Sequence, residues 1–367
     1  MAEIGIGIVG GGYMGKAHSV AMSSVGAIFN TELRPKLEMI CATSDASSER
    51  YRAAYGFERA TSDWRVLVND PKVEAVVIAS PQGTHREIAL AAFELGKPVL
   101  CEKPLGASLE DSLAMVEAAE TSGAINMVGY NYIRTPASQF VRSLLADEAL
   151  GQIISFRAEH TEDFLSDPRA PGNWRTEGRA NGNMGDLAPH PINAALALMG
   201  PISSVLAEIE TVYPTRGGVP VTNDDQAHIL CRFESGVLGT IFSSRVSTGR
   251  KMGYAYEITG SKGAVRFDQE DQNSVWLYRA EGPEAERGFR KILTGPSHPD
   301  YEPFCLGPGH GTGYQDQIII EAKDFLTAIS KGENIWPTFR DGMDVNRIVK
   351  AAHLSSDEKR WVDVKTV

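Results

Sequence analysis

The chain has 367 residues, 42% hydrophobic and 23% charged, which suits a globular protein of two packed domains and excludes a disordered or fibrous chain. Its formal net charge of −11 argues against nucleic-acid binding, because neutralising phosphates needs clustered Lys and Arg. No stretch approaches the roughly 20 apolar residues of a membrane-spanning helix, and the first residues lack the pattern of a secretory signal.

Four cysteines are scattered along the chain without C-x-x-C spacing: Cys41, Cys101, Cys231 and Cys305. Such scattering is typical of reduced thiols and gives no support to a metal site. We therefore expect a cytoplasmic protein that uses no metal.

The first 130 residues alternate between short apolar runs and segments with helical spacing. The runs that predict strands are Ile4 to Val9, Leu37 to Ala42, Ala75 to Ala79, Pro98 to Cys101 and Asn126 to Gly129. Helical spacing covers His85 to Leu95 and Leu109 to Ser122. Buried strands separated by helices predict an α/β domain over residues 1–130, with a parallel sheet whose strands all end along one edge. Ligands bind at that edge in open α/β sheets.

The pattern changes after about Gly151, where strand-like segments follow one another with few helices. These segments are Ile153 to His160, Val205 to Val212, Ala227 to Phe233, Gly239 to Val246, Tyr254 to Thr259 and Ala264 to Phe267. They predict a second α/β domain over residues 131–367, with an open, mostly antiparallel sheet and helices on one face. Such a sheet leaves its other face available, and a homo-oligomer interface is the usual way of covering such a face.

Three further segments complete the second domain. A helix is expected over Ile192 to Met199, and an irregular Pro/Gly-rich loop over Gly282 to Gly313. Two amphipathic helices are expected near Gln315 to Ser330 and Gly342 to Ser355, and their packing back on the first domain is left open.

The motif Gly10-x-Gly12-x-x-Gly15 directly follows a predicted strand and opens a predicted helix, with Tyr13 and Met14 inside it. The three glycines permit a tight turn, a close approach to a pyrophosphate and close packing of helix on sheet. A purely structural turn is the alternative. The context favours nucleotide binding.

The choice between NAD and NADP depends on an acidic residue after the second strand, which binds the ribose 2′-hydroxyl in NAD-dependent folds. Here that strand is followed by Ser44 and Asp45, and residues 27–36 lengthen the spacing from the glycines. Asp45 is the candidate, with capping of the next helix as its alternative role. NAD is predicted, and NADP remains open.

Two groups could handle protons. Lys103 follows a buried strand, so it would stand at the carboxyl edge of the sheet, where an ammonium can hold a reacting hydroxyl. A solvated lysine is the alternative. Asp186 and His190 are four residues apart and would share one face of a helix, with His190 as a proton acceptor. The alternative makes Asp186 a helix cap and His190 an ordinary first-turn residue.

Taken together, these motifs resemble those of the Gfo/Idh/MocA oxidoreductases, and the resemblance covers essentially the whole chain. Its marks are Gly10-x-Gly12-x-x-Gly15 with His18, Ser80-Pro81 with His85, Glu102-Lys103-Pro104, Gly129-Tyr130-Asn131, Trp174-Arg175, Asp186-x-x-x-His190 and Arg360-Trp361-Val362. The resemblance implies a Rossmann domain followed by an α/β domain with an open sheet that binds substrate. It also implies sugar or polyol substrates and assembly into a homodimer or homotetramer.

The resemblance also implies roles for individual residues. Lys103, Asp186 and His190 would form the catalytic trio, with His190 as the general base. Pro81, His85, Glu102 and Asn131 would line the nicotinamide ribose, and Ser80 would also bind the cofactor. Trp174 and Arg175 would approach cofactor or substrate. Departures at 180–185, Pro191 and Asn193 affect positions that face substrate in relatives, so the identity of the sugar is not transferred.

Weaker substrate candidates are Tyr130 and Tyr132, which could stack on a sugar ring, and His160, which would point from a strand toward the pocket. His310 and Tyr314 could enter the same pocket or that of a neighbouring subunit. For each of these residues, a core or solvent-exposed position is the alternative.

The leading hypothesis is an NAD(P)-dependent dehydrogenase that oxidises a secondary hydroxyl of an inositol, hexose or anhydrosugar. One alternative keeps the fold but retains NAD through a cycle of glycoside hydrolysis or of hydride transfer between sugars. Another is a dinucleotide-sensing regulator without catalysis. Retention of Lys103, Asp186 and His190 argues against the regulator.

Overall fold

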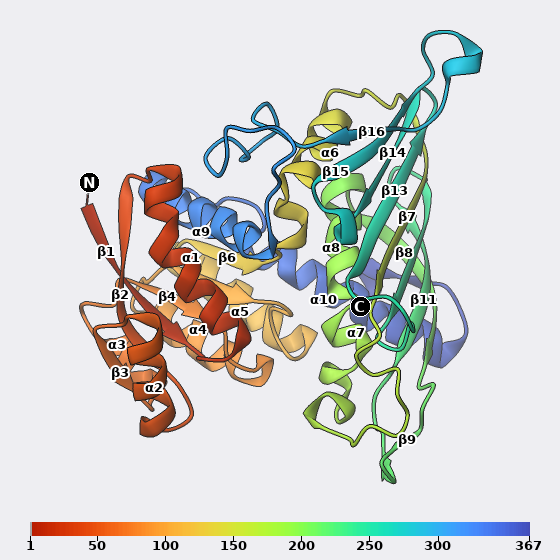
Figure 1. The fold of residues 1–367 in the computed structure, drawn as a ribbon. Coiled ribbons are helices and arrows are strands. Elements are labelled where there is room, and N and C mark those ends of the chain that lie inside the picture. The colour runs from red at the N-terminus through yellow and green to blue at the C-terminus, as the bar shows by residue number, and fades with distance from the viewer. Residues whose placement is uncertain (1) are drawn as a thin grey trace. The chain divides into compact units, whose positions relative to one another are not determined.

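The computed structural model describes residues 2–367, apart from the side chain of Trp174. The chain forms two compact units (Figure 1). The N-terminal unit consists of residues 2–134 together with Gly313–Asn346. The C-terminal unit consists of Thr135–Thr312 and Arg347–Val367.

The N-terminal unit is built on a six-stranded parallel sheet with the order β3-β2-β1-β4-β5-β6. Its strands are β1 (Ala2–Val9), β2 (Leu33–Cys41), β3 (Arg59–Thr61), β4 (Ala75–Ile78), β5 (Val99–Glu102) and β6 (Asn126–Gly129). Strands β4, β5 and β6 are buried throughout, as expected for a parallel sheet covered on both faces. The predicted Rossmann sheet is therefore confirmed.

Helices connect the strands of this sheet. They are α1 (Tyr13–Phe29), α2 (Asp45–Tyr55), α3 (Trp64–Asn69), α4 (His85–Glu94) and α5 (Leu109–Ser122). Helix α9 (Tyr314–Lys331), drawn in blue in Figure 1, packs along α1, drawn in red. Helix α10 (Phe339–Glu358) begins in the N-terminal unit and ends in the C-terminal unit.

The C-terminal unit contains a nine-stranded sheet with the order β16-β15-β14-β13-β7-β12-β11-β8-β17. Its strands are β7 (Ile153–Thr161), β8 (Ile202–Glu210), β11 (Gln226–Phe233), β12 (Leu238–Ser244), β13 (Gly253–Gly260), β14 (Gly263–Asp268), β15 (Ser274–Arg279), β16 (Arg290–Leu293) and β17 (Val362–Asp363). Neighbours pair antiparallel except β7 and β12, which are parallel. The expected open, mostly antiparallel sheet is confirmed.

Helices α6 (Pro136–Ala146), α7 (Asn183–Asp186) and α8 (Pro189–Met199) pack on one face of this sheet. The side chains of β11 show the two faces, because buried Ile229 and Cys231 alternate with exposed His228 and Leu230. A small hairpin, β9 (Thr215–Arg216) and β10 (Val219–Pro220), stands apart from the sheet.

Several elements differ from the expectation. Strand β16 lies inside the predicted irregular loop 282–313, where glycines and prolines mask a four-residue strand. Helix α8 begins at Pro189, earlier than the predicted Ile192, because proline is well suited to the first turn of a helix. Helix α6 was not predicted. Its signals are the capping side chain of Thr135, which accepts from the backbone of Ser138, and Pro136 in the first turn.

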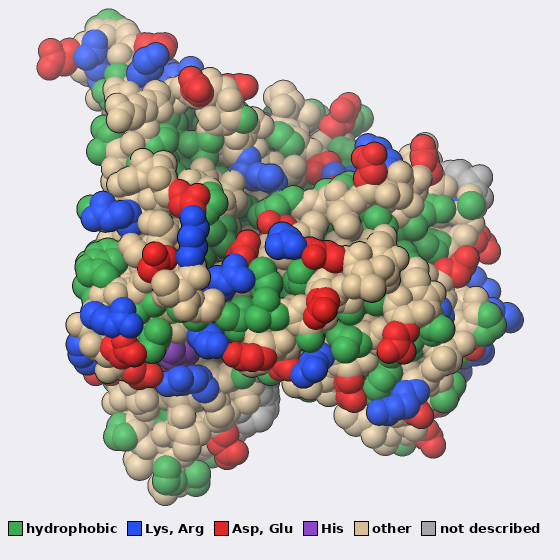
Figure 2. Space-filling view, turned by 180° about the vertical axis from the view of Figure 1, so that it is seen from behind, with side chains coloured by type: hydrophobic (Ala, Val, Ile, Leu, Met, Phe, Trp, Pro, Cys, Tyr) green, Lys and Arg blue, Asp and Glu red, His purple; other side chains and the backbone are tan. Residues whose placement is uncertain are grey.

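No helix within residues 2–367 combines the length and apolar character required to cross a membrane. On the face drawn in Figure 2, Lys and Arg side chains are interspersed with Asp and Glu, rather than gathered in one basic patch.

Candidate active site

The glycine motif forms the turn between β1 and α1. Gly10 has a φ of 105°, and a Cβ there would lie 2.4 Å from the carbonyl oxygen of Ala79. A Cβ at Gly15 would lie 1.9 Å from the carbonyl oxygen of Gly10. These two glycines are therefore required by the turn itself.

Gly12 differs from the other two glycines. It is the N-cap of α1, and a Cβ there would meet no atom of the described residues within 4 Å. No acidic residue occupies the first turn of this 17-residue helix. Open space in front of uncapped helix N–H groups suits the diphosphate of a dinucleotide, so the residues present fit that cofactor.

The segment after β2 starts helix α2. Ser44 is its N-cap, and the Ser44 hydroxyl accepts a hydrogen bond from the backbone of Ser47 in a capping box. Asp45 is the first residue of the helix and is exposed, so its alternative role as the cap is wrong. The Tyr55 hydroxyl donates to the Gly11 carbonyl at 3.0 Å and ties α2 to the glycine turn.

Because all six strands are parallel, the residues that follow them meet at one edge of the sheet. The glycine turn follows β1, Ser80 follows β4, Lys103 follows β5, and Asn131 follows β6. Since β1, β4, β5 and β6 are consecutive in the sheet, the structure brings these predicted residues together. Lys103 is half-buried there.

His85 connects two of these segments. Its Nε2 lies 2.9 Å from the Ser80 carbonyl, and its Nδ1 lies 3.1 Å from the carbonyls of both Pro104 and Leu105. Burial lowers the pKa of His85, although the carbonyls act in the opposite direction. These contacts hold the loop that carries Lys103 against the segment that follows β4.

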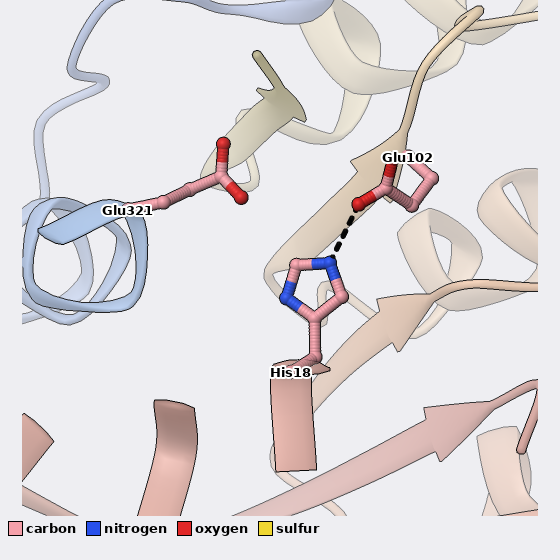
Figure 3. Close-up of side chains that lie close together, drawn as sticks. All are labelled: His18, Glu102 and Glu321. Atoms are coloured by element: carbon pink, nitrogen blue, oxygen red, sulfur yellow. Dashed lines mark hydrogen bonds and ion pairs between the residues drawn. The ribbon is translucent and has the colours of Figure 1, made fainter. Parts of the chain in front are cut away.

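A buried cluster of charges lies beneath the same edge (Figure 3). The ring of His18, on α1, points toward Glu102 at the end of β5, and Glu321 approaches from α9. His18 Nε2 lies 2.8 Å from Glu102 Oε1. Burial lowers the pKa of His18, but the hydrogen bond and charge of Glu102 and the charge of Glu321 outweigh it, so this pKa is raised. Burial raises the pKa of Glu321 to about 7, against the pull of Arg134 and His18.

The ligand atoms of His18, Glu102 and Glu321 lie within 4.8 Å of one another, a spacing that a metal ion could bridge. All three groups already have partners: Glu102 binds His18, and Arg134 Nε lies 3.5 Å from Glu321 Oε1. Arg134 also pairs with Asp324. The Arg134 guanidinium therefore supplies the positive charge beside Glu321 that a metal ion would otherwise supply.

Helix α9 contributes further contacts. Asn131 Nδ2 donates to Gln317 Oε1 at 3.0 Å, and both side chains are buried. The Tyr314 hydroxyl lies 3.4 Å from Met14 Sδ, and its ring stacks on that of Tyr13 at 5.9 Å. Tyr314 is therefore part of the N-terminal unit, beside the glycine helix.

In the C-terminal unit, Asp186 and His190 do not share one helix. Asp186 ends α7, His190 is the second residue of α8, and the chain turns between them. The N-cap of α8 is Ala188, so the alternative role of Asp186 as a cap is wrong. The Asp186 carboxylate pairs with the guanidinium of Arg175, which lies over the Phe164 ring.

A buried polar network holds this segment. The Asp224 carboxylate accepts from the Met184 N–H at 2.7 Å. Arg245 Nε lies 3.1 Å from Asp225, and its Nη1 donates to the Arg175 carbonyl at 2.7 Å. Arg216, also buried, lies 3.4 Å from the same carboxylate, so removing Asp225 would leave two buried guanidinium groups without their shared partner.

His190 is 5% exposed and lies among aromatic rings. Its centroid is 5.3 Å from that of His160 and 6.5 Å from that of Tyr254. His160 is buried, with Nδ1 3.1 Å from the Leu187 carbonyl and Nε2 3.0 Å from Glu162 Oε1. The alternative of an exposed His160 is wrong.

The remaining candidates lie in varied surroundings. Tyr130 and Asn193 are buried, and burial raises the pKa of Tyr130. His310 is exposed, with Nδ1 3.2 Å from Cys305 Sγ. The side chain of Trp174 lies outside the described part of the chain.

Sequence reasoning missed Glu321, Glu162 and the Asp225–Arg245 pair. Glu321 carries a recognisable signal, since it directly follows the apolar run 318–320 on a helix. A charge within an apolar stripe needs a buried partner. Asp225 and Arg245 gave no such signal, because each stands at the end of a strand pattern where polar residues are common.

Comparison with known proteins agrees with this architecture. Residues 4–130 match the model of an oxidoreductase family with an NAD-binding Rossmann fold, and residues 138–266 match the GFO/IDH/MocA C-terminal domain. Levoglucosan dehydrogenase from Pseudarthrobacter phenanthrenivorans is 36% identical over 100% of both chains. Inositol 2-dehydrogenase from Rhizobium meliloti is 28% identical over 98% of each chain.

Solved structures include levoglucosan dehydrogenase in complex with NADH and levoglucosan, at 36% identity and a TM-score of 0.96 over 99% of each chain. The family models and the relative that matches over its full length lead to one assignment. This chain belongs to the Gfo/Idh/MocA family of oxidoreductases.

Proposed function

We propose that this protein is an NAD-dependent dehydrogenase that oxidises a secondary hydroxyl of a sugar, anhydrosugar or cyclic polyol. The observation that carries the proposal is the carboxyl edge of the N-terminal sheet, where an open glycine turn and Lys103 follow neighbouring parallel strands. Similarity to dehydrogenases of levoglucosan and inositol over the whole chain supports it. Levoglucosan is the first substrate to test.

Three residues carry the proposed reaction. NAD⁺, when bound, accepts a hydride from the carbon that bears the hydroxyl. The Lys103 ammonium holds that hydroxyl and stabilises the negative charge that develops on its oxygen. His190 takes the hydroxyl proton. Asp186, paired with Arg175, provides a carboxylate that orients the substrate or the imidazole.

The other site residues divide by unit in this proposal. Cofactor contacts in the N-terminal unit are Gly10, Gly12, Tyr13, Met14, Gly15, Ser44, Asp45, Ser80, Pro81, His85, Glu102 and Asn131. Trp174 and Arg175 approach cofactor or substrate from the C-terminal unit. Tyr130, Arg175 and Asn193 contribute to the substrate pocket, with His160 behind His190. In this proposal, residues 1–130 bind the cofactor, and residues 131–367 bind the substrate and form the interface of the homo-oligomer.

A spectrophotometric screen tests the function. Levoglucosan, inositols, hexoses and pentoses are each offered with NAD⁺ and NADP⁺, and reduced nicotinamide is followed by absorbance. Stoichiometric NADH formation from at least one sugar is expected. Absence of turnover across the panel, with NADH binding intact, would contradict the proposal and favour a regulator.

The role of Lys103 is tested by Lys103→Ala. Turnover is expected to fall at least about 100-fold, because one electrostatic stabiliser of this kind contributes that much. Affinity for NADH is expected to persist. The matched control is Lys72→Ala, since Lys72 is exposed and precedes β4 at the opposite edge of the same sheet. Equal activity of both variants would exclude the mechanism.

The relatives are named as dehydrogenases, which does not favour the glycoside-hydrolysing, sugar-to-sugar or regulatory alternatives. A cytoplasmic location is part of the proposal, supported by the free state of the four cysteines within the described residues.

We also propose that the open face of the large sheet joins copies of this chain into a homodimer or homotetramer. A hollow of about 480 Å³ on this face is lined by Leu206, His228, Leu230 and Phe242. The His228 and Phe242 rings stack there at 4.4 Å, and Leu230 is 46% exposed. Light scattering should give a multiple of the chain mass, and Leu230→Glu should lower it. A monomeric wild-type protein would contradict the proposed homo-oligomer.

A further inference from the structure

A backbone carbonyl between Asp186 and His190 connects this segment to the large sheet. The Leu187 carbonyl accepts two hydrogen bonds, one from the His190 backbone N–H at 3.2 Å and one from the His160 ring at 3.1 Å. Leu187 stands between the two proposed catalytic residues. A side chain of the sheet therefore fixes the turn that carries them.

His160 is itself held from both sides. It is 1% exposed on β7, and its other ring nitrogen lies 3.0 Å from the Glu162 carboxylate. The backbone of Glu162 is anchored as well, through Glu162 N to Ser244 O at 2.8 Å and Ser247 N to Glu162 O at 2.9 Å. Across the strand pair, Tyr254 is the register partner of His160, and their centroids lie 5.9 Å apart.

We propose that His160, anchored by Glu162, is a positioning residue that sets the orientation and protonation state of His190. The proposal rests on the proposed function, since His190 is the base of that reaction. One continuous chain of hydrogen bonds runs from the sheet to helix α8. It passes from Glu162 to His160, then to the Leu187 carbonyl and the His190 N–H.

The protonation part follows from the acceptors. A carbonyl and a carboxylate both accept, so His160 makes its two hydrogen bonds together only when both ring nitrogens carry a proton. A cation with its centroid 5.3 Å from that of His190 disfavours a second cation there. His190 is thereby kept neutral and ready to accept the substrate proton.

Other charges near α8 must be included in this balance. Helix α8 packs against β7, β12, β13, α6 and α7. Of these elements, β12 carries no titratable side chain. The titratable and charged groups on the other elements are Arg157, Glu159 and His160 on β7, Tyr254, Tyr256 and Glu257 on β13, Arg142 on α6 and Asp186 on α7. Glu162, just after β7, and the Arg175 partner of Asp186 complete the set. None of these is altered by the variants below except His160 and Glu162.

Glu162→Gln separates charge from geometry. The glutamine amide can donate to the ring nitrogen that the carboxylate accepted from, so both hydrogen bonds of His160 persist while the ring becomes neutral. The acid limb of kcat/KM is expected to move to higher pH by up to about one pH unit, from Coulomb's law at an effective dielectric of about 20. The plateau at high pH is expected to stay near the wild-type value.

His160→Phe keeps an aromatic ring but removes both hydrogen bonds. The turnover number is expected to fall about 10- to 100-fold, as small misplacements of a reacting group cause. NADH affinity should be unchanged, because the glycine turn belongs to the other unit. His353→Phe is the matched control, a half-buried histidine in the same unit that makes none of these contacts.

Imidazole ¹⁵N NMR of the free enzyme reads the protonation of His160 without turnover. We expect two protonated nitrogens in the wild type at neutral pH and one in Glu162→Gln. A neutral His160 in the wild type, or an unchanged pH profile in Glu162→Gln, would overturn the proposal even if His160→Phe fails to fold. Loss of all sugar oxidation in the wild type would instead overturn the proposed function, and the NMR result would still stand.

Discussion

The three glycines of the first turn should respond differently to an added methyl group. At Gly12 the backbone has a φ of −72°, and a Cβ would meet no atom of the described residues within 4 Å, so Gly12→Ala should fold normally. At Gly15 the Cβ would lie 1.9 Å from the Gly10 carbonyl oxygen, so backbone must move. The same substitution therefore probes cofactor access at one position and folding at the other.

The magnitudes follow from these geometries. For Gly12→Ala, a poorer helix cap is offset by a less flexible unfolded chain, so stability should change by less than about 1 kcal/mol. Holding the diphosphate away from the helix end costs a charge-assisted hydrogen bond of about 1.5–3 kcal/mol, which weakens NADH binding about 10- to 100-fold. For Gly15→Ala, overpacking should lower stability by about 1–3 kcal/mol.

The assay combines a fluorescence titration with NADH and a urea unfolding curve of each cofactor-free variant. Gly12→Ala should lose affinity at wild-type stability, and Gly15→Ala should lose stability. The reasoning would be refuted by a Gly12→Ala variant that binds NADH as tightly as the wild type. It would equally be refuted by a Gly15→Ala variant with unaltered unfolding.

Three further predictions concern the charges of the site. Glu321 has its pKa raised from 4.5 to about 7, so its contribution to stability is present below pH 4.5 and lost as the pH rises through 7. Glu321→Gln should remove about 3.5 kcal/mol of this pH dependence, at about 1.4 kcal/mol per pH unit, and an unchanged pH dependence of unfolding in calorimetry would contradict it. Asp225→Leu leaves the buried Arg245 and Arg216 without their shared carboxylate and should cost about 3–5 kcal/mol in urea unfolding, whereas wild-type stability would show that this carboxylate is dispensable. Asp45→Asn should raise NADP⁺ use relative to NAD⁺ about 10-fold in kcat/KM, and an unchanged ratio would exclude Asp45 from the ribose site.

The fold was largely predictable because its signals are local. Buried runs such as Ala75–Ile78 and Val99–Glu102 stand between helical segments, and their order implies parallel pairing. The four-residue strand β16 was missed because it is short and lies in a Gly- and Pro-rich segment, although it pairs with β15, the strand before it in the chain. Short edge strands are specified by their neighbours rather than by their own residues.

The site was predictable only in part. Lys103 and the glycine turn could be placed because each follows a strand of one parallel sheet. The partners of His160 could not be foreseen, since contact with Leu187 joins a strand to a turn 27 residues away. Likewise, the spacing of Asp186 and His190 suggested a single helix, whereas the chain breaks between them at Leu187 and Ala188.

The most direct test is a crystal structure of this protein with NADH and an oxidisable sugar. The account predicts the diphosphate on the turn at Gly12, and Lys103 Nζ and the His190 ring both within about 3 Å of the same sugar hydroxyl. Lys103 and His190 on different hydroxyls, or in separate cavities, would contradict it.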